Sequence, residues 1–463
     1  MGQRSKQATR TIWTLGFLCV TGIGALWTVA VRAQENAGPL VTLGVGLGAD
    51  YEANDPGDDD TSVFADLVLG LSNSNRVSDV DLRFDGRFQL EDGEFELEDP
   101  GATLLYSRAN RSTALDLSFS YREQDADGDL FIPDPLTFSS VDLIEDDGSR
   151  ETIRVGVGLQ TGLDARFGTD TELSFLDRTF TGTSDPDLTD LQVFRGNTAL
   201  RFDVSPALSL RVTGAYVNSD EEDIEETERE TFRVGIGATA RIDQVWSVST
   251  DLRYARIDTD MLDIFTGAPI SDTEEGVGFN VAVVRALLNG DIGLSLGREI
   301  TETGDRDEIR LSRSLTMANG SELSGSIGLV DFEEGDVSVV GGLSFALPTR
   351  RGGLLLDFQQ QARFDEDDGN VINTFLTGRY ESSINAVSNW AVFGTLARVD
   401  SLDDLSDSDQ TSVRAGISYD YAITRDWDLS AAFDHRIDFE GDSETDQTSV
   451  VSLTLQRSFS FRP

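Results

Sequence analysis

The sequence has 463 residues, of which 39% are hydrophobic, and its 83 acidic residues far outnumber its 37 basic residues. One cysteine and one histidine leave no material for a disulfide framework and little for a zinc site or a Ser-His-Asp triad. The formal charge of −46 repels nucleic acid and attracts cations, so nucleic acid is not an expected partner.

The N-terminal segment, residues 1–33, has the pattern of a secretory signal peptide. Basic residues among the first ten precede an apolar stretch over residues 12–31, and Ala33 ends a suitable cleavage site. A membrane anchor is the alternative use of such a segment. Cleavage would remove four basic residues and Cys19, leaving one domain, residues 34–463, with a charge of 33 − 83 = −50.

From residue 40 onward, segments of about ten to fifteen residues alternate apolar and polar side chains, which predicts strands with one apolar and one polar face. Two kinds of connection alternate between them, and by our count the long ones hold 59 of the 83 acidic residues while the short ones hold five. The long connections are predicted at 52–60, 91–99, 123–150, 181–190, 219–230, 258–275, 301–308, 331–336, 365–370, 400–409 and 438–447. The short connections are predicted at 72–77, 109–112, 162–165, 203–207, 242–245, 288–291, 318–321, 348–352, 384–389 and 423–426.

These connections predict an all-β fold, a transmembrane antiparallel up-and-down β-barrel of about 22 strands, with 20 to 24 allowed. An even strand number places both termini on one side, which we expect to be the periplasm. About seven residues separate the predicted cleavage site from the first strand, so no plug domain is expected. The long connection 123–150 has an apolar middle, which predicts either a constriction inside the pore or one further hairpin that would give 24 strands.

The signal sequence, the repeated alternating hairpins and the last strand, SVVSLTLQRSFSF, resemble those of Gram-negative outer-membrane β-barrel proteins of the porin type. The resemblance covers residues 40–463. It implies an outer-membrane location, contact with lipid and lipopolysaccharide, and a final strand that the barrel-assembly machinery recognises by its aromatic end. Phe461 matches that end, although Arg462 and Pro463 follow it and Arg457 interrupts the apolar face.

The polar face of the alternation predicts the wall of the lumen, where Arg and Asp on neighbouring strands can pair. Such a wall either orients solutes by its field or only lets the charges satisfy one another. The candidate pore-lining residues are Asp81, Arg83, Asp85, Arg87, Asp116, Arg122, Arg154, Arg211, Arg233, Asp251, Arg253, Arg414, Asp434 and Arg436. The candidate aromatic girdle of the membrane interface is Trp246, Trp427, Tyr121, Tyr216, Tyr254, Phe459 and Phe461.

The predicted function is a channel for passive diffusion of small hydrophilic solutes, with a preference for cations because acidic loops surround its mouth. The alternatives are a barrel for export or anchoring of a surface polysaccharide, and a non-conducting structural or adhesive barrel. No enzyme is expected, because a triad or zinc site would have to use His435, the single histidine. The alternation of the strand places His435 on the apolar face, towards lipid. Neither a cofactor nor a metal site is expected, since the run Asp125, Asp127 and Asp129 lacks the Glu that completes a calcium loop.

Overall fold

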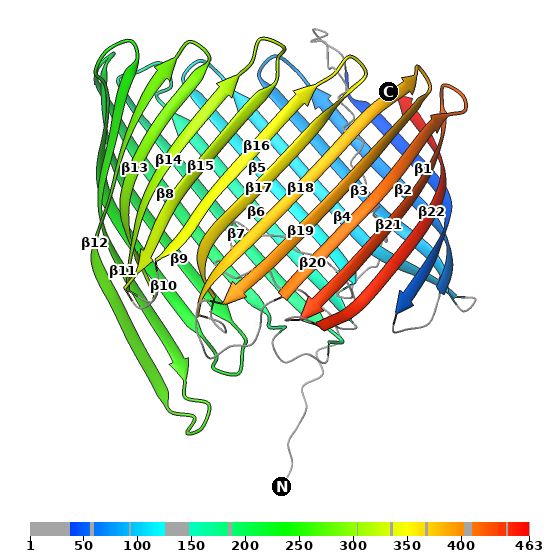
Figure 1. Ribbon diagram of the computed structural model, residues 1–463, viewed down its shortest axis with the longest axis horizontal. Coiled ribbons are helices and arrows are strands. Elements are labelled where there is room, and N and C mark those ends of the chain that lie inside the picture. The colour runs from blue at the N-terminus through cyan, green and yellow to red at the C-terminus, as the bar shows by residue number, and fades with distance from the viewer. Residues whose placement is uncertain are drawn as a thin grey trace.

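The computed structural model describes residues 38–55, 60–91, 94–125, 148–183, 188–302, 304–333, 337–365, 369–401, 410–440 and 443–462. Within these residues the chain forms one antiparallel sheet of 22 strands, which Figure 1 shows as a closed barrel. β1 (Leu40–Asp55) pairs with both β2 and the last strand, β22 (Ser443–Phe461), and this second pairing closes the sheet. The other strands are β2 (Asp60–Ser74), β3 (Ser78–Glu91), β4 (Glu94–Ala109), β5 (Thr113–Asp125), β6 (Ser149–Thr161), β7 (Phe167–Thr181), β8 (Leu191–Ser205), β9 (Leu208–Glu221), β10 (Glu228–Arg241), β11 (Trp246–Leu262), β12 (Pro269–Leu287), β13 (Gly290–Thr301), β14 (Gly304–Thr316), β15 (Glu322–Phe332), β16 (Ser338–Pro348), β17 (Gly352–Asp365), β18 (Gly369–Asn385), β19 (Ser388–Ser401), β20 (Gln410–Ala422) and β21 (Trp427–Glu440).

The prediction of 22 antiparallel strands is confirmed. The predicted signal peptide, residues 1–33, and most of the predicted constriction loop, residues 126–147, lie outside the described residues. No helix in the described part of the chain is long and apolar enough to cross a membrane.

The alternating pattern sorts side chains onto two faces of the closed sheet. One face is apolar, as where Val413 of β20 lies opposite Ile437 of β21. Its side chains stay exposed, for example Ile236 at 61%, as contact with lipid tails requires, and we call it the outer face. On the other, inner face, side chains of strands that are not neighbours meet: Arg229 of β10 lies 3.1 Å from Glu302, which follows β13.

The two ends of the barrel have different connections. The turn end carries the short connections and Phe461, and the opposite, loop end carries the long ones (Figure 1). At the turn end, the side-chain carbonyl of Asn75 accepts hydrogen bonds from the N–H groups of Val77 and Ser78, at 3.0 and 3.1 Å, and Asn110 acts in the same way in the next short turn. These local bonds fix the conformation of the tight turns.

Connections at the loop end are shorter than predicted. Residues 258–275 were expected to form a loop, yet β11 continues to Leu262 and β12 begins at Pro269. Likewise, strands occupy both ends of the predicted connection 219–230. Beyond the apolar band both faces of a strand are polar, so the sequence alternation stops while the backbone ladder continues, because that ladder does not depend on side-chain polarity.

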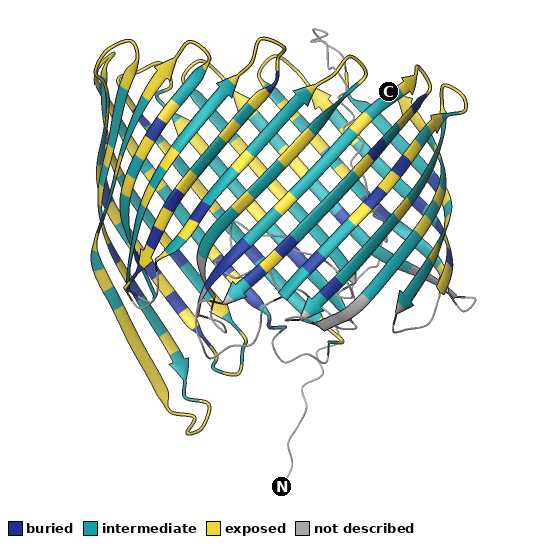
Figure 2. Cartoon of the chain, in the orientation of Figure 1, coloured by how far each residue is buried: buried dark blue, intermediate teal, exposed yellow. Residues whose placement is uncertain are grey.

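Burial is concentrated towards the loop end, as the dark segments near the lower rim in Figure 2 show. Inner-face residues there are almost completely buried, including the apolar group Leu176, Leu191, Val193 and Val217 on β7 to β9. One hairpin, β11–β12, projects beyond the rest of this rim (Figure 1). The inner wall therefore changes in character from one end of the barrel to the other.

Candidate functional site

The candidate site is the inner face of the barrel. The strand register places every predicted lumen residue on this face: Asp81, Arg83, Asp85, Arg87, Asp116, Arg122, Arg154, Arg211, Arg233, Asp251, Arg253, Arg414, Asp434 and Arg436. Small inner-face residues such as Gly156, Ser118 and Thr213 lie between them. That these residues line a solute path stays a prediction.

A first group of charges, the β1–β3 cluster, joins Asp50, Asp66 and Arg87 around Phe64. The Arg87 guanidinium lies 3.1 Å from Asp50 through Nη1 and 3.1 Å from Asp66 through Nε. Its carbon also lies 3.6 Å from the centroid of the Phe64 ring, so the cation stacks on an aromatic face. One guanidinium thus serves two carboxylates that are both largely buried, and the cluster is fixed by charge pairing and by aromatic contact.

Asp85 connects two arginines next to this cluster. Its carboxylate, which is buried, lies 2.9 Å from Arg83 on the same strand and 3.7 Å from Arg122 on β5. The pair with Arg122 spans the intervening β4 at Gly101, where an added Cβ would lie 3.0 Å from Asp85. Because Gly101 has no side chain, the side chains of Asp85 and Arg122 can approach each other across β4.

A similar arrangement occurs farther around the wall. Arg211 of β9 donates to Asp251 of β11, with Nε 2.8 Å from Oδ1, and Gly237 of β10 lies between them in the register. A Cβ at Gly237 would collide with both side chains. Inner-face glycines therefore let arginine and aspartate pair across a strand, which the neighbour-to-neighbour pairing predicted from the sequence does not include.

A larger group, the β10–β14 cluster, lies near the loop end. Arg229 pairs with Glu302 at 3.1 Å, and Glu299 lies 3.8 Å from Arg233 and 2.6 Å from Arg306. Arg229 is almost fully buried and the other four are partly buried. Three arginines meet two glutamates here, so the cluster has one excess positive charge.

Arg253 of β11 adds to that positive charge. It lies close enough to act electrostatically on Arg233. Its Nε is buried without a hydrogen-bond partner, and no ion pair joins Arg253 to a carboxylate among the described residues. A guanidinium in this position is a ready donor for a carboxylate, phosphate or other oxyanion.

β20 and β21 carry the remaining predicted pairs. Arg414 lies 2.6 Å from Asp434 on the neighbouring strand, as the predicted cross-strand pairing requires. Arg436 instead pairs at 2.7 Å with Asp438 on its own strand, and Asp438 is fully buried. Buried carboxylates of this kind need their cation, because an unpaired charge in such a position is very costly.

Among the described residues, two predicted residues, Asp81 and Asp116, form no ion pair with an arginine. Asp81 lies opposite Ser72 and Leu105, and Asp116 lies opposite Ser107, so no arginine stands beside either in the register. Both are exposed. Arg154 lies opposite Leu176 and Ser120.

Sequence reasoning missed seven of the charged residues in these pairs and clusters. The missed residues are Asp50, Asp66, Arg229, Glu299, Glu302, Arg306 and Asp438. Some of them could have been found from the sequence, because they lie at the polar positions of a predicted alternating strand, as Asp66 does. Most of the others fell inside connections that were predicted as loops, where parity was not applied.

Neither a family model nor a curated protein sequence matches this chain. Solved structures of similar fold include the open form of the ferric-catecholate import receptor Fiu from E. coli K12, with a TM-score of 0.55, 11% identity, and coverage of 89% of this chain and 81% of that one. The FrpB iron transporter from Neisseria meningitidis gives a TM-score of 0.60 at 8% identity, covering 92% and 83%. The copper transporter OprC gives 0.53 at 11% identity, covering 90% and 80%.

The fold is that of a Gram-negative outer-membrane β-barrel. One part of the predicted fold class is wrong, namely the expectation of a barrel without a plug domain. The similar solved barrels named above are TonB-dependent receptors, a class that carries a plug domain. The expectation rested on the short stretch before the first strand, and residues 1–37 lie outside the described residues, so that stretch is no argument about a plug.

In an outer-membrane barrel the outer face meets lipid, and aromatic residues of the predicted girdle lie on that face at both ends. At the turn end, the Arg457 guanidinium lies 5.2 Å from the Trp427 ring and 4.4 Å from the Phe459 ring. Trp246 makes a similar contact, at 5.3 Å, with Arg285. Phe461 lies opposite Val41 where the barrel closes. Arg457, which interrupts the apolar face, is thus covered by aromatic rings.

At the loop end, the tyrosines of the predicted girdle each donate a hydrogen bond to a glutamate. The distances are 3.0 Å for Tyr121 to Glu123, 2.9 Å for Tyr216 to Glu230, and 2.6 Å for Tyr254 to Glu275. A ring with a paired hydroxyl suits the boundary between lipid and water. That these aromatics mark the two membrane interfaces stays a prediction.

His435 lies on the outer face of β21, where its ring stacks on Phe433 with centroids 6.4 Å apart. Its Nδ1 lies 2.8 Å from the hydroxyl of Ser449. Within the described residues, no three or more His, Cys, Asp or Glu side chains gather in a way that could hold a metal ion. The described inner face carries ion pairs and hydrogen-bonding side chains.

Proposed function

We propose that this protein is an outer-membrane transporter of the receptor type, which binds a hydrophilic anionic solute on the inner wall near the loop end before the solute crosses the barrel. The observation that carries the proposal is the β10–β14 cluster with Arg253, where arginines outnumber carboxylates on a partly buried inner wall. Arginine binds carboxylates and other oxyanions in bidentate geometry, and partial burial strengthens such bonds.

The proposed solute is a metal ion held in a small anionic chelate. Support for this class comes from two sources. The similar barrels include an import receptor for ferric catecholates and a copper transporter, and that likeness concerns the fold. The excess of guanidinium groups on the inner wall supplies the complementary charge for such a chelate. A barrel of 22 strands is also wide, and outer-membrane transporters of that size have an obstructed lumen and do not act as open pores.

Passive diffusion is the second candidate. Towards the turn end the inner face carries small and polar side chains such as Ser249, Asn280 and Ser295, which suit a water-filled path. With acidic loops at the other end, such a path would favour cations.

Two measurements on the full-length protein separate the candidates. In a planar bilayer, the receptor-type transporter is expected to give little steady conductance, whereas a passive channel gives stable steps with K⁺ favoured over Cl⁻. Stable, solute-independent steps would contradict the proposal.

The binding step is tested with ferric citrate and a ferric tris-catecholate as probes, using equilibrium binding to the protein in detergent. Replacing Arg253→Gln is expected to weaken binding of the better probe by about tenfold, because one charge-assisted bond is lost. The matched control, Arg108→Gln, removes an exposed arginine from the outer face at the turn end and should leave the affinity unchanged. Equal losses in both variants would show that only the overall charge matters.

A further inference from the structure

The projecting β11–β12 hairpin leaves one of its strands without a neighbour. β12 pairs with β11 along its whole length, from Leu287 near the turn end to Pro269 opposite Leu262. Its pairing with β13 stops at Phe279 opposite Arg298. Within the described residues, 269–278 of β12 therefore form a free strand edge, which lies on the hairpin that extends below the rim in Figure 1.

The hydrogen bonds of the hairpin show which backbone groups face this free edge. The N–H of Ala286 donates to Val245 at 2.7 Å, and Ala268 accepts from Asp263 at 2.9 Å, so even-numbered residues of β12 direct their backbone groups to β11. In an antiparallel ladder the alternate residues point the opposite way. The N–H and C=O groups at the free edge are those of the odd-numbered residues 271, 273, 275 and 277.

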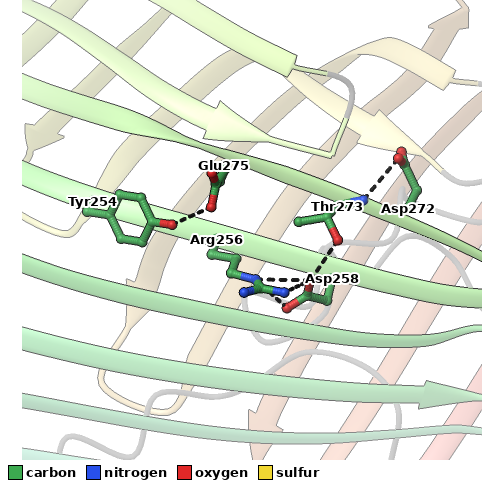
Figure 3. Close-up of polar contacts among 6 residues, drawn as sticks. All are labelled: Tyr254, Arg256, Asp258, Asp272, Thr273 and Glu275. Carbon is green, nitrogen blue, oxygen red and sulfur yellow. Dashed lines mark hydrogen bonds and ion pairs between the residues drawn. The ribbon is translucent and has the colours of Figure 1, made fainter.

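Thr273 confirms this assignment. Its N–H, which has no backbone partner on the free side, donates to the carboxylate of the preceding Asp272 at 2.9 Å (Figure 3). Its hydroxyl donates to Asp258 on β11 at 2.8 Å, and Arg256 holds that same carboxylate. Side chains on the outer surface of the hairpin are thus joined to one another by hydrogen bonds. The backbone N–H and C=O groups along its edge could form hydrogen bonds with a further strand.

Local contacts are also present at both ends of this edge. At the tip, the Asp263 carboxylate accepts hydrogen bonds from the N–H groups of Phe265 and Thr266 at 3.0 and 2.7 Å. At the base, Gly276 lies so close to the buried Ile300 that no side chain would fit at this glycine without a shift. A preformed edge binds an extended segment at a lower entropic cost than a flexible one.

We propose that the free edge of β12 is a docking site for an extended, lysine- or arginine-rich segment of another protein, which adds to the sheet as a further strand. Exposed strand edges are templates for such addition, in which main-chain bonds give affinity and side chains give selectivity. Asp272, Glu274 and Glu275 belong to the strand that carries this edge and make it acidic, so a cationic segment is the complementary partner. Beside them, Phe265 is 90% exposed at the tip and Ile270 is 43% exposed, which provides apolar contacts for one end of the segment.

A second copy of this chain is not the partner. Two copies in one membrane are related by an axis along the membrane normal, so their tilted β12 edges would cross at a large angle. Strand pairing requires parallel or antiparallel alignment, which this symmetry does not provide.

The test uses fluorescence anisotropy with the full-length protein in detergent and three labelled ten-residue peptides. The first alternates Lys with Val or Thr, the second has the same sequence with alternate amides N-methylated, and the third replaces each Lys by Glu. We expect saturable binding of the first peptide. The N-methylated peptide, which keeps the charge but lacks the edge donors, should bind at least tenfold more weakly, and the Glu peptide should not bind.

Variants of the protein test the same edge from the other side. Ser271→Pro together with Val277→Pro removes two free-edge donors that β11 does not use, and should weaken binding of the Lys peptide at least tenfold. The matched control, Ser271→Ala together with Val277→Ala, keeps both donors and should bind as the unmodified protein does. Equal binding of the Lys and N-methylated peptides would overturn the proposal, because it would show that the surface only attracts charge. Absence of binding by any peptide would also overturn it, and would assign the carboxylates to protection of the edge.

Discussion

The two ends of the barrel are built on different principles. At the turn end, residues such as Asn75 and Asn110 fix the hairpins by local hydrogen bonds, and inner-wall charges such as Arg201 and Asp203 remain partly exposed. At the loop end, the wall contains charged pairs with buried members, such as Arg229, which pairs across strands, and Asp438, which pairs along its own strand. Local bonds tolerate substitution nearby, whereas a buried pair does not, so the two ends should respond differently to mutation.

The largest effect is expected at Arg229. Its replacement by Ala leaves Glu302, which is mostly buried, without its cation and should destabilise the barrel by about 3 kcal/mol. The measurement is the urea unfolding midpoint of the protein in lipid vesicles, followed by circular dichroism. The double variant Arg229→Leu with Glu302→Leu should recover most of the loss, because no buried charge remains.

The turn end supplies the control for that variant. Arg111 and Asp164 form an ion pair at 2.9 Å in which the Arg111 side chain is 90% exposed. Replacing Arg111→Ala should change stability by less than about 1 kcal/mol, since water screens the pair. A loss at Arg111 as large as that at Arg229 would show that the two ends do not differ in this way.

The next effect sharpens the comparison with a pair that lies nearer the turn end. Gly237→Ala places a Cβ against Arg211 and Asp251 and should cost about 1 to 2 kcal/mol in the same unfolding assay, because the pair must separate or shift. Gly214 on the neighbouring strand has nothing within 4 Å of an added Cβ. Gly214→Ala should therefore be neutral or slightly stabilising, and equal costs at both glycines would indicate a backbone requirement instead of a side-chain clash.

The strand count could be predicted because lipid and water impose a two-residue period on every strand. The pairs of the inner wall could not. Arg211 meets Asp251 across Gly237, and Arg233 meets Glu299 although β10 and β13 are not neighbours. Such contacts depend on the register, on the curvature of the wall and on where a glycine leaves space, none of which periodicity contains.

The free edge of β12 was missed for a related reason. Residues 258–275 were predicted as a loop because the regular alternation of apolar and polar residues stops there, yet they contain the ends of two paired strands. Once a strand leaves the apolar band, nothing in its side-chain pattern distinguishes it from a loop. The backbone ladder continues there, and only the pairing partners show that one of its edges is open.

A smaller effect is expected at the aromatic contacts of the turn end. Trp427→Leu removes the ring beside the Arg457 guanidinium, 5.2 Å away, while it keeps an apolar side chain at the interface. The cost should be about 1 kcal/mol in the vesicle unfolding assay, because a cation on the lipid-facing surface loses one aromatic partner and Phe459 remains. Arg457→Leu in the same background should restore the lost stability, since the charge that needed the ring is gone. Failure of that rescue would mean that Trp427 acts through packing alone.

The smallest effect is expected at the tip of the β11–β12 hairpin, where acid should loosen a local turn without unfolding the barrel. Hydrogen bonds from the Thr266 hydroxyl and from backbone N–H groups lower the pKa of Asp263 below its ordinary value of 3.8. A lowered pKa in the folded turn means that the stabilising contribution is complete above pH 3.8 and is lost as the pH falls through the lower, folded value. Hydrogen exchange of the Phe265 and Thr266 amides should therefore gain an extra acceleration below about pH 3.8, relative to the Asp263→Asn variant at each pH. Asparagine keeps a carbonyl acceptor but does not titrate, so an identical pH response in both proteins would remove the Asp263 carboxylate as the cause and leave the rigidity of the docking edge to its strand pairing alone.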